Sequence, residues 1–260
     1  MPQALSLKPR ILVTNDDGID APGLKVLETI ARGLSDDVWV VAPETQQSGA
    51  AHSVSLHKPI RFRELDAKRF AVSGTPTDCV ITALRVIIPE QVDLVLSGVN
   101  RGPNIADDIT HSGTVAAAME GTLCNIRSIA FSQSFDFDAE DPVIHWQTAG
   151  AHASGIIARL LEAEWEKDVF FNVNFPNLPP EAVKGVKCVA QGKHNFFKQL
   201  LRDEGADPAY WVSWADAGAD PRRPDVDIHW MPLGYITVTP LCLDLTHYAM
   251  LARLKHSIES

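Results

Sequence analysis

The chain has 260 residues, of which 45% are hydrophobic, and it carries a formal net charge of -10 at pH 7. This length and composition are enough for one domain with a large apolar core. The negative charge argues against binding of duplex nucleic acid through a broad basic face, because phosphate neutralisation dominates such affinity. It does not exclude one small anionic ligand held by backbone N–H groups and a metal.

Nothing in the sequence indicates a secreted or membrane-spanning protein. The first ten residues are too few and too polar for a signal peptide. No stretch approaches the roughly 18 apolar residues that a membrane span needs. The cysteines have no CxxC spacing and predict buried free thiols rather than disulfides or zinc ligands: Cys79, Cys124, Cys188 and Cys242. We therefore expect a soluble protein of a reducing compartment, cytoplasmic in a bacterium.

The chain up to about residue 175 alternates short apolar runs with helical patterns. Strands are predicted at Ile11–Thr14, Val38–Ala42, Arg69–Val72, Asp93–Ser97, Ile126–Ser132 and Val169–Val173. Helices are predicted at Pro22–Leu34 with Asp20 as a possible N-cap, after a capping box at Thr75–Asp78, after Ser112, and at His145–Trp165. Apolar strands separated by helices predict an α/β fold with a mostly parallel sheet that helices cover on both faces.

The C-terminal part of the sequence has a different character. Between Gln191 and Asp227 the composition turns to Gly, Pro, Asp and aromatic residues without periodicity. Such a length without a pattern indicates a functional or partner-contacting extension. We expect an oligomer-forming arm with Trp211, Trp214 and Trp230 as aromatic anchors. A strand is predicted at Gly234–Pro240, followed by a helix at Thr246–Ile258 that Asp244 or Thr246 opens.

Two adjacent carboxylates, Asp16 and Asp17, follow the first predicted strand. Neighbouring side chains on a strand point to opposite faces, so the two carboxylates converge only where the chain already turns, and Gly18 allows such a turn. Two carboxylates that close repel each other unless a cation lies between them. The pair therefore favours a hard divalent metal. The alternative is a solvated turn in which one Asp only caps the next helix.

Other polar residues follow the neighbouring strands. In an open α/β sheet, ligands gather at the carboxyl ends of the strands. Ser48 lies after the second strand, and Asn100 and Asn104 lie after Asp93–Ser97. All these candidate ligands are oxygen donors, a set that suits Mg²⁺, Mn²⁺ or Ca²⁺ rather than structural zinc.

The run Ser112-Gly113-Thr114 precedes an Ala-rich helix. The first N–H groups of a helix have no internal partner and lie at the positive end of its dipole, where a phosphate fits. Alone the run indicates only a helix cap. Together with an acidic metal site on neighbouring strand ends, it suggests a bound phosphoester that faces a divalent cation.

The same residues resemble the conserved blocks of the SurE family of stationary-phase survival proteins, which are metal-dependent 5'/3'-nucleotidases. The resemblance extends from Arg10 to about Thr246, with the blocks in the family's order. The blocks are Asn15–Gly23, Val41–Pro43 with Ser48–Gly49, Ser73–Val80, Ser97–Asn104, Ser112–Gly121, Asn172–Pro176, and Thr239–Leu241 with Asp244–Thr246.

The resemblance implies a domain organisation. It implies one Rossmann-like α/β domain over residues 1–260, with a core at about 10–190. An extended hairpin arm at about 191–232 and a swapped C-terminal strand-helix segment at about 233–260 would serve oligomerisation, as a homodimer or homotetramer.

The resemblance also implies site residues, and one divalent cation per subunit, Mg²⁺ or Mn²⁺. The metal ligands would be Asp16, Asp17, Ser48 and Asn100; the phosphate contacts would be Asn100, Asn104, Ser112, Gly113 and Thr114; and the catalytic residues would be Asp16, Asp17 and Asn104. Three further residues in the strand-end loops are candidates for supporting roles around the site: Asn15, His52 and His111. Two positions depart from the family pattern. His111 replaces a common Tyr, and Val226–Trp230 replaces a Thr-Asp-x-x-Ala run, which leaves substrate contacts from that region open.

The expected reaction is hydrolysis of nucleoside 5'-monophosphates, with 3'-monophosphates as a second candidate, by attack of a metal-activated water. One alternative is that Asp16 or Asp17 acts as a nucleophile and forms an aspartyl-phosphate, but enzymes of that kind use Asp-x-Asp spacing rather than adjacent carboxylates. Another is a non-catalytic nucleotide-binding regulator, which needs no full set of oxygen ligands. The sequence does not identify the preferred nucleotide, the physiological metal or the choice between dimer and tetramer.

Overall fold

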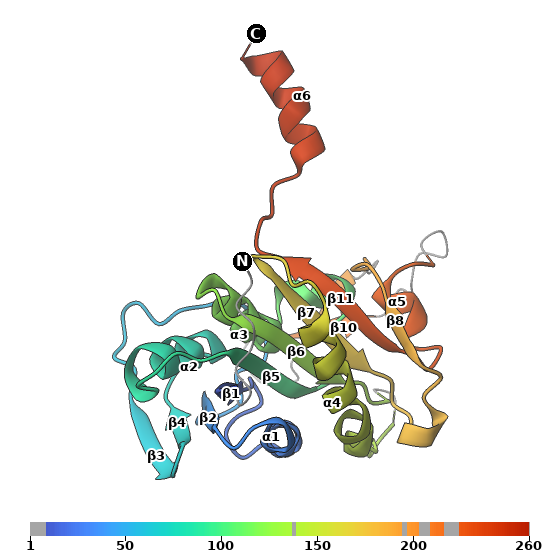
Figure 1. Cartoon of the computed structure of the whole chain (residues 1–260). Helices are drawn as coiled ribbons and strands as arrows, with labels where there is room; N and C mark the ends of the chain where they lie inside the picture. The colour runs from blue at the N-terminus through green and yellow to red at the C-terminus, as the bar shows by residue number, and fades with distance from the viewer. Residues whose placement is uncertain (1–8, 137–138, 194–196, 203–208, 216–223, 260) are drawn as a thin grey trace.

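The computed structural model describes residues 9–136, 139–193, 197–202, 209–215 and 224–259. A large twisted sheet forms the centre of the molecule, with helices on both of its faces (Figure 1). Its strands are β1 (Ile11–Thr14), β2 (Val38–Pro43), β3 (Phe62–Asp66), β4 (Arg69–Val72), β5 (Leu94–Arg101), β6 (Arg127–Gln133), β7 (Val169–Phe175), β8 (Val186–Cys188) and β11 (Ile236–Cys242). A separate two-stranded sheet consists of β9 (Phe197–Arg202) and β10 (Tyr210–Ala215).

The helices of the described residues alternate with these strands in the first part of the chain. They are α1 (Pro22–Leu34), α2 (Pro76–Thr82), α3 (Gly113–Leu123), α4 (Trp146–Glu162), α5 (Asp227–Trp230) and α6 (Tyr248–Ile258). Shorter helical turns are η1 (Ala83–Ile87), η2 (Ala106–Thr110) and η3 (Pro180–Ala182).

The large sheet has the strand order β3-β4-β2-β1-β5-β6-β7-β11-β8. Within this order, the six strands β4, β2, β1, β5, β6 and β7 are parallel to one another. At the two sides of this group, β3 is antiparallel to β4 and β11 is antiparallel to β7. The mostly parallel sheet is confirmed, but it is a mixed one. The chain order changes direction at β1, which has β2 on one side and β5 on the other, so the carboxyl ends of β1 and β5 meet at a topological switch point.

Both faces of the sheet are buried under helices, as predicted. Ile11 and Val13 of β1 pack in one core with α1 and α4, while Leu12, between them, packs in a second core with α2 and Ala117 of α3. All three β1 side chains are fully buried. Because successive side chains alternate between faces, a strand with helices on both sides must be apolar throughout.

Most predicted elements are confirmed, with shifts at their ends. β5 continues to Arg101, beyond the expected end at Ser97, because a register irregularity after Ser97 lets Asn100 pair with Ser132 of β6. The capping box of Thr75 and Asp78 is present. β3 and β8 were not predicted, since both are short and partly or fully exposed.

Two other predicted caps, those of α1 and α6, were wrong. The N-cap of α1 is Ala21 rather than Asp20, and it makes no side-chain capping bond. α6 begins after His247, whose ring nitrogen Nδ1 accepts a hydrogen bond from the N–H of Met250, rather than after Asp244 or Thr246. Asp244 instead bonds the N–H of Thr246 and so belongs to the turn before the helix.

The cysteines are free, but the prediction that they are buried holds only for Cys79. Cys124 is half-buried, and Cys188 and Cys242 are exposed because they lie at the margin of the sheet. Among the helices of the described residues, none combines the length and the apolar character that a membrane crossing needs.

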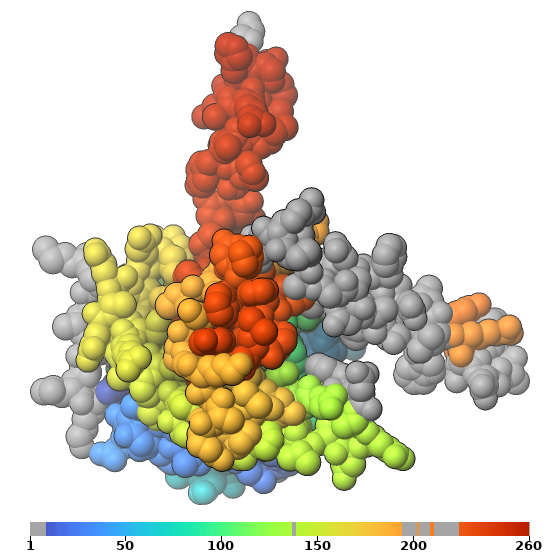
Figure 2. Space-filling view, turned by 90° about the vertical axis from the view of Figure 1, so that its right-hand side faces the viewer, coloured from blue at the N-terminus to red at the C-terminus, as the bar shows by residue number. Residues whose placement is uncertain are grey.

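The C-terminal region contains the two features least attached to the core. β9 and β10 form an antiparallel pair in the segment where the residue pattern predicted no element and the family resemblance implied a hairpin arm. The side chains of Trp211 and Trp214 lie outside the described residues. Trp230, the third expected anchor, packs edge-to-face on Tyr235, with ring centroids 5.1 Å apart. α6 projects away from the sheet (Figures 1 and 2).

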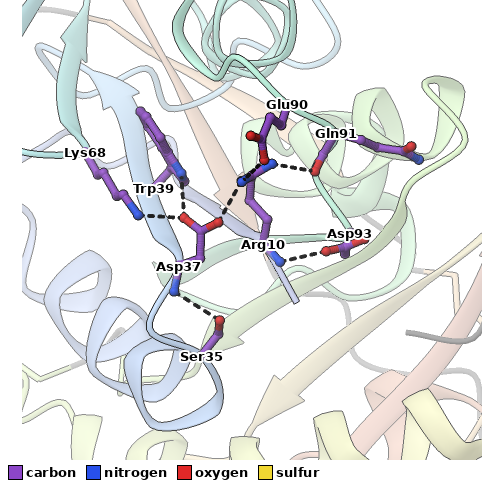
Figure 3. A network of polar contacts seen from close by, with 8 residues as sticks. All are labelled: Arg10, Ser35, Asp37, Trp39, Lys68, Glu90, Gln91 and Asp93. Carbon is purple, nitrogen blue, oxygen red and sulfur yellow. Dashed lines mark hydrogen bonds and ion pairs between the residues drawn. The ribbon is translucent and has the colours of Figure 1, made fainter. Parts of the chain in front are cut away.

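A polar network joins the amino ends of four strands, at the edge of the sheet opposite to the predicted ligand site (Figure 3). The Nε of Arg10 lies 2.8 Å from Oδ2 of Asp37, and the backbone N–H of Arg10 donates to Asp93 over 2.7 Å. Lys68 donates to the other oxygen of Asp37 over 2.7 Å, and Trp39 donates to the same oxygen. The network therefore links the segments that lead into β1, β2, β4 and β5.

Candidate metal and phosphate site

The first strand ends in the tight turn that the sequence predicted. The side chain of Asn15 closes this turn, since its Nδ2 donates to the carbonyl of Gly18 over 3.0 Å and its Oδ1 accepts from the N–H of Gly18 over 3.3 Å. Gly18 has a φ of 103°, a conformation that favours glycine. Asn15 is therefore a turn-forming residue, and it places Asp16 and Asp17 at the carboxyl end of β1.

Asp16 lies against the first turn of α3. The hydroxyl of Thr114 donates a hydrogen bond to Oδ1 of Asp16. Gly113 is packed so closely that a Cβ on this residue would lie 2.8 Å from Cβ of Asp16 and 2.9 Å from Cγ of Pro76. The structure thus brings the candidate metal ligand and the candidate phosphate-binding helix into direct contact.

Asp17 is joined to the end of β5 instead. Its Oδ2 accepts a hydrogen bond of 2.9 Å from the backbone N–H of Arg101. The neighbouring Asn100 donates its Nδ2 to the carbonyl of Gly102 over 2.9 Å, so its amide oxygen is the atom that suits a cation. The ends of β1 and β5, which carry these oxygen donors, are therefore joined at the switch point.

Both carboxyl groups are perturbed electrostatically. Burial and the negative charge of Asp17 raise the pKa of Asp16 to about 7, although the hydrogen bond from Thr114 acts in the opposite direction. Burial also raises the pKa of Asp17, against the lowering effect of the Arg101 backbone hydrogen bond and charge. A divalent cation beside both groups would remove this electrostatic cost, because it stabilises their ionised forms.

Ser48 lies on the loop after β2, and the structure attaches this loop to Asp16 through its backbone. The N–H of Gln47 donates to the carbonyl of Asp16 over 2.8 Å. The side chain of Ser48 is exposed, and its Oγ accepts a hydrogen bond from Gln46 over 2.8 Å. The backbone of the Ser48 loop is therefore hydrogen-bonded to Asp16, whereas the hydroxyl of Ser48 is hydrogen-bonded within its own loop.

The two candidate histidines hold the far end of the same loop. Nε2 of His52 lies 2.9 Å from Oε2 of Glu120 on α3. The carbonyl of His111 accepts a 3.2 Å hydrogen bond from the N–H of Ala51. These contacts give His52 and His111 a role in fixing the Ser48 loop against α3.

The start of α3 has the properties of an anion site. Ser112 is its N-cap, and its Oγ accepts a 3.1 Å hydrogen bond from the N–H of Val115. The backbone N–H groups of Gly113 and Thr114, in the first turn, have no partner within the helix. They remain as donors at the positive end of the helix dipole.

Asn104 lies beside β6 and β7 and is almost fully buried. Its Nδ2 donates to Oγ of Ser132 over 2.8 Å. Its backbone N–H donates to Oδ1 of Asn174 over 2.8 Å, and its carbonyl accepts hydrogen bonds from the amides of Asn172 and Asn174. No role was predicted for these two asparagines, although amides two residues apart in a buried strand are a signal of a shared polar face.

The altered segment Val226–Trp230 makes structural contacts through Asp227. Asp227, which is fully buried, accepts hydrogen bonds from the N–H of Ala106 over 3.0 Å and from the N–H of Gly192 over 2.8 Å. It therefore fastens α5 to the turn that follows Asn104 and to the segment that leads into β9.

The oxygen donors at the switch point fit a hard divalent cation. Across the described residues, no three His, Cys, Asp or Glu side chains are grouped as a metal site. A cation at Asp16 and Asp17 would therefore need the amide of Asn100 or the hydroxyl of Ser48, together with water. Two carboxylates with neutral oxygen ligands form a set that Mg²⁺ and Mn²⁺ accept.

Comparisons with known proteins identify the family of the chain. Residues 11–198 match the family described as Survival protein SurE. The chain is 54% identical over 247 residues to the 5'-nucleotidase SurE of Brucella canis, and the match covers 94% of this chain and 96% of that protein. The protein of the same name from Brucella suis shows the same identity and coverage.

A solved structure is similar over almost the whole chain. The crystal structure of the SurE protein from Aquifex aeolicus superposes with a TM-score of 0.81 at 36% sequence identity. The match covers 96% of this chain and 99% of that one.

Proposed function

The chain belongs to the SurE family, and from this membership we propose that it is a divalent-metal-dependent 5'-nucleotidase that hydrolyses the phosphomonoester of nucleoside 5'-monophosphates. The observation that carries the proposal is the direct contact between Asp16 and the start of α3. This contact supports the proposal because it would set the proposed cation site beside the proposed anion site, the arrangement that a phosphomonoester bound to a metal requires.

In this proposal, Asp16, Asp17 and the amide oxygen of Asn100 hold one Mg²⁺ or Mn²⁺ ion, with Ser48 as a further ligand. When bound, such an ion acts as a Lewis acid on a phosphoryl oxygen and lowers the pKa of the attacking water. Thr114 fixes Asp16 through its hydroxyl, and Arg101 fixes Asp17 through its backbone N–H. The two carboxylates are thereby held before any ligand arrives.

The phosphoryl group would lie over the start of α3. The N–H groups of Gly113 and Thr114 would donate to its oxygens, with the helix dipole favouring the negative charge that grows in the transition state. One hydrogen of the Asn104 amide is directed to Ser132, so its second amide hydrogen would serve as a further donor. Ser112 contributes by capping α3 and so fixing the direction of its first N–H groups.

We also propose that the β9–β10 hairpin and α6 serve a homodimer or homotetramer. The support for α6 is its exposure, since its apolar side chains Tyr248 and Ile258 are at least 66% exposed, as is Leu245 in the turn before it. A helix with so little packing of its own is stabilised mainly by a partner surface. The free cysteines support a reducing compartment such as the cytoplasm.

The proposed activity is tested by phosphate release from AMP in the presence of Mn²⁺, Mg²⁺ or EDTA. We expect release with a metal and none with EDTA, and we expect Asp16→Asn and Asp17→Asn to abolish it while both variants remain folded. Turnover at the wild-type rate in EDTA would contradict the metal requirement. A phosphoenzyme trapped by acid quench would replace the water mechanism with an aspartyl-phosphate.

A further inference from the structure

The loop after β5 carries Asn104 at a place where the backbone has no strand or helix of its own. Buried backbone N–H and C=O groups in such a segment need partners. The side chain of Asn174 supplies both: its Oδ1 accepts from the N–H of Asn104 over 2.8 Å, and its Nδ2 donates to the carbonyl of Asn104 over 3.1 Å. One amide of β7 therefore holds both backbone groups of one residue 70 positions earlier in the chain.

A second asparagine of the same strand reinforces this contact. Asn172 donates its Nδ2 to the carbonyl of Asn104 over 2.7 Å. Within the described part of the protein, the other atom of this amide, Oδ1, is buried and has no hydrogen-bond partner. A buried acceptor without a partner costs free energy. The Asn172 amide leaves its Oδ1 in this state while its Nδ2 bonds Asn104, so the bond to Asn104 explains the orientation of the side chain.

The side chain of Asn104 is fixed from a third direction. Ser132 of β6 pairs with Asn174 of β7 in the sheet register, and its hydroxyl accepts a hydrogen bond from the Asn104 amide. The backbone and the side chain of Asn104 are thus attached to two rigid, adjacent strands rather than to its own loop. Groups held on strands are positioned more precisely than groups held only by loops.

We infer that Asn172 and Asn174 are positioning residues of the phosphate site, which act through Asn104 and do not touch the substrate. This inference rests on the proposed function, in which the Asn104 amide is a phosphate donor. An error of about 1 Å in the placement of a group at a reacting centre costs about 100-fold in rate. The role of the asparagine pair is to prevent such an error.

A double-mutant cycle tests this role. Asn174→Ala should lower kcat/KM for AMP by about 10-fold to 100-fold in the otherwise wild-type enzyme. Asn104→Ala should lower it by about 100-fold to 1,000-fold, the range for loss of one oriented donor. In the Asn104→Ala background, Asn174→Ala should add less than about 3-fold, because residues that act as a unit are not additive.

Thr237→Val is the matched control. Thr237 pairs with Asn174 in the β7–β11 register, and its hydroxyl is buried and without a partner among the described residues. Removing that hydroxyl changes a buried polar group beside Asn174 without touching Asn104, so kcat/KM should stay within about 2-fold of the wild-type value.

The inference is overturned if Asn174→Ala lowers kcat/KM by the same factor in both backgrounds, or leaves it unchanged in a folded protein. If Asn174→Ala does not fold, Asn172→Leu decides, because Leu has the same branched outline of four side-chain heavy atoms and removes both the donor to Asn104 and the unpartnered oxygen. Asn172→Leu should lower kcat/KM by about 3-fold to 10-fold, and this effect should likewise vanish in the Asn104→Ala background.

The inhibition constant of inorganic phosphate gives a second readout that a general loss of packing would not move selectively. Asn174→Ala should raise this constant together with the KM for AMP, whereas Thr237→Val should change neither. A folded Asn104→Ala enzyme with wild-type kcat/KM would remove Asn104 from the site and overturn the inference, while metal-dependent turnover by the wild type would leave the proposed function intact.

Discussion

Gly113 packs directly on Asp16, and a Cβ on Gly113 would lie 2.8 Å from Cβ of Asp16. The contact involves the root of the Asp16 side chain rather than a flexible end, so even one methyl group must displace either the carboxylate or the start of α3. The spacing between Asp16 and the start of α3, where the cation and the phosphate are proposed to bind, therefore depends on a glycine at this position.

Gly113→Ala should reduce metal-dependent turnover by about 100-fold or more, because the carboxylate and the α3 N–H groups can no longer approach each other. The overpacked methyl should also destabilise the fold by about 1–3 kcal/mol. Steady-state kinetics and urea denaturation measure the two effects. Gly33→Ala is the control, since Gly33 is an exposed helix residue with open space around its Cβ position, and it should be neutral or stabilising. Equal kinetics for Gly113→Ala and Gly33→Ala would show that the close contact is not needed.

The raised pKa of Asp16 predicts a dependence of stability on pH in the metal-free protein. In the folded state this carboxyl group is protonated below about pH 7, whereas in the unfolded chain it ionises above its ordinary value of 3.8. The folded state therefore binds more protons between these values, and the free energy of unfolding should fall as the pH rises through this window.

Asp16→Asn should remove that contribution and be more stable than the wild type at pH 8 in EDTA, by about 1 kcal/mol or more. Its amide oxygen can still accept the hydrogen bond from Thr114. Urea denaturation at pH 5 and pH 8 measures the difference. An identical pH dependence for wild type and variant would contradict the prediction.

Asp37, at the other edge of the sheet, predicts a pH dependence of stability opposite in sign to that of Asp16 (Figure 3). Partial burial acts to raise its pKa, but the hydrogen bonds from Lys68 and Trp39 and the charge of Arg10 outweigh burial and lower it. The stabilisation is therefore present above the unfolded pKa of 3.8 and is lost as the pH falls through the lower folded value.

Asp37→Asn should cost about 1 kcal/mol at pH 7, since the group is partly exposed and solvent screens its ion pairs. The cost should shrink as the pH falls below about 4, where the wild-type carboxyl also becomes neutral. Thermal melts of both proteins at several pH values test this. A cost that stays constant down to pH 2 would indicate lost packing rather than a lost charge.

The projecting C-terminal helix predicts an effect on assembly. Removal of residues 243–260 should yield a smaller species in sedimentation velocity, because the exposed apolar side chains of α6 are the surface that a partner would cover. Apart from Leu243, this segment takes no part in the described hydrophobic clusters, so the truncated chain should still melt cooperatively. A wild-type protein that sediments as a monomer at micromolar concentration would rule out the proposed role of α6.

Local sequence patterns determined much of the fold. The apolar run Ile11–Thr14 predicts β1, and the helical periodicity of Pro22–Leu34 predicts α1, because both signals depend on residues close together in the chain. The rule that ligands gather at strand ends also selects Asp16, Asp17 and Asn100, since parallel strands bring their carboxyl ends to one edge. Elements with weak local signals, such as β3 and β8, were not found.

Only the tertiary structure decided how the site is assembled. Thr114 and Asp16 are 98 residues apart, and Asn104 and Asn174 are 70 residues apart, so no local pattern relates them. Their contacts depend on the strand order, which places β5 beside β1 and β7 beside β6, and on the packing of α3 against the sheet. Chain propensities act over a few residues, whereas the position of a buried side chain is set by whichever distant elements share its core. The sequence therefore determined which residues lie at the edge of the sheet, and the packing of α3 and β7 decided what each of them touches.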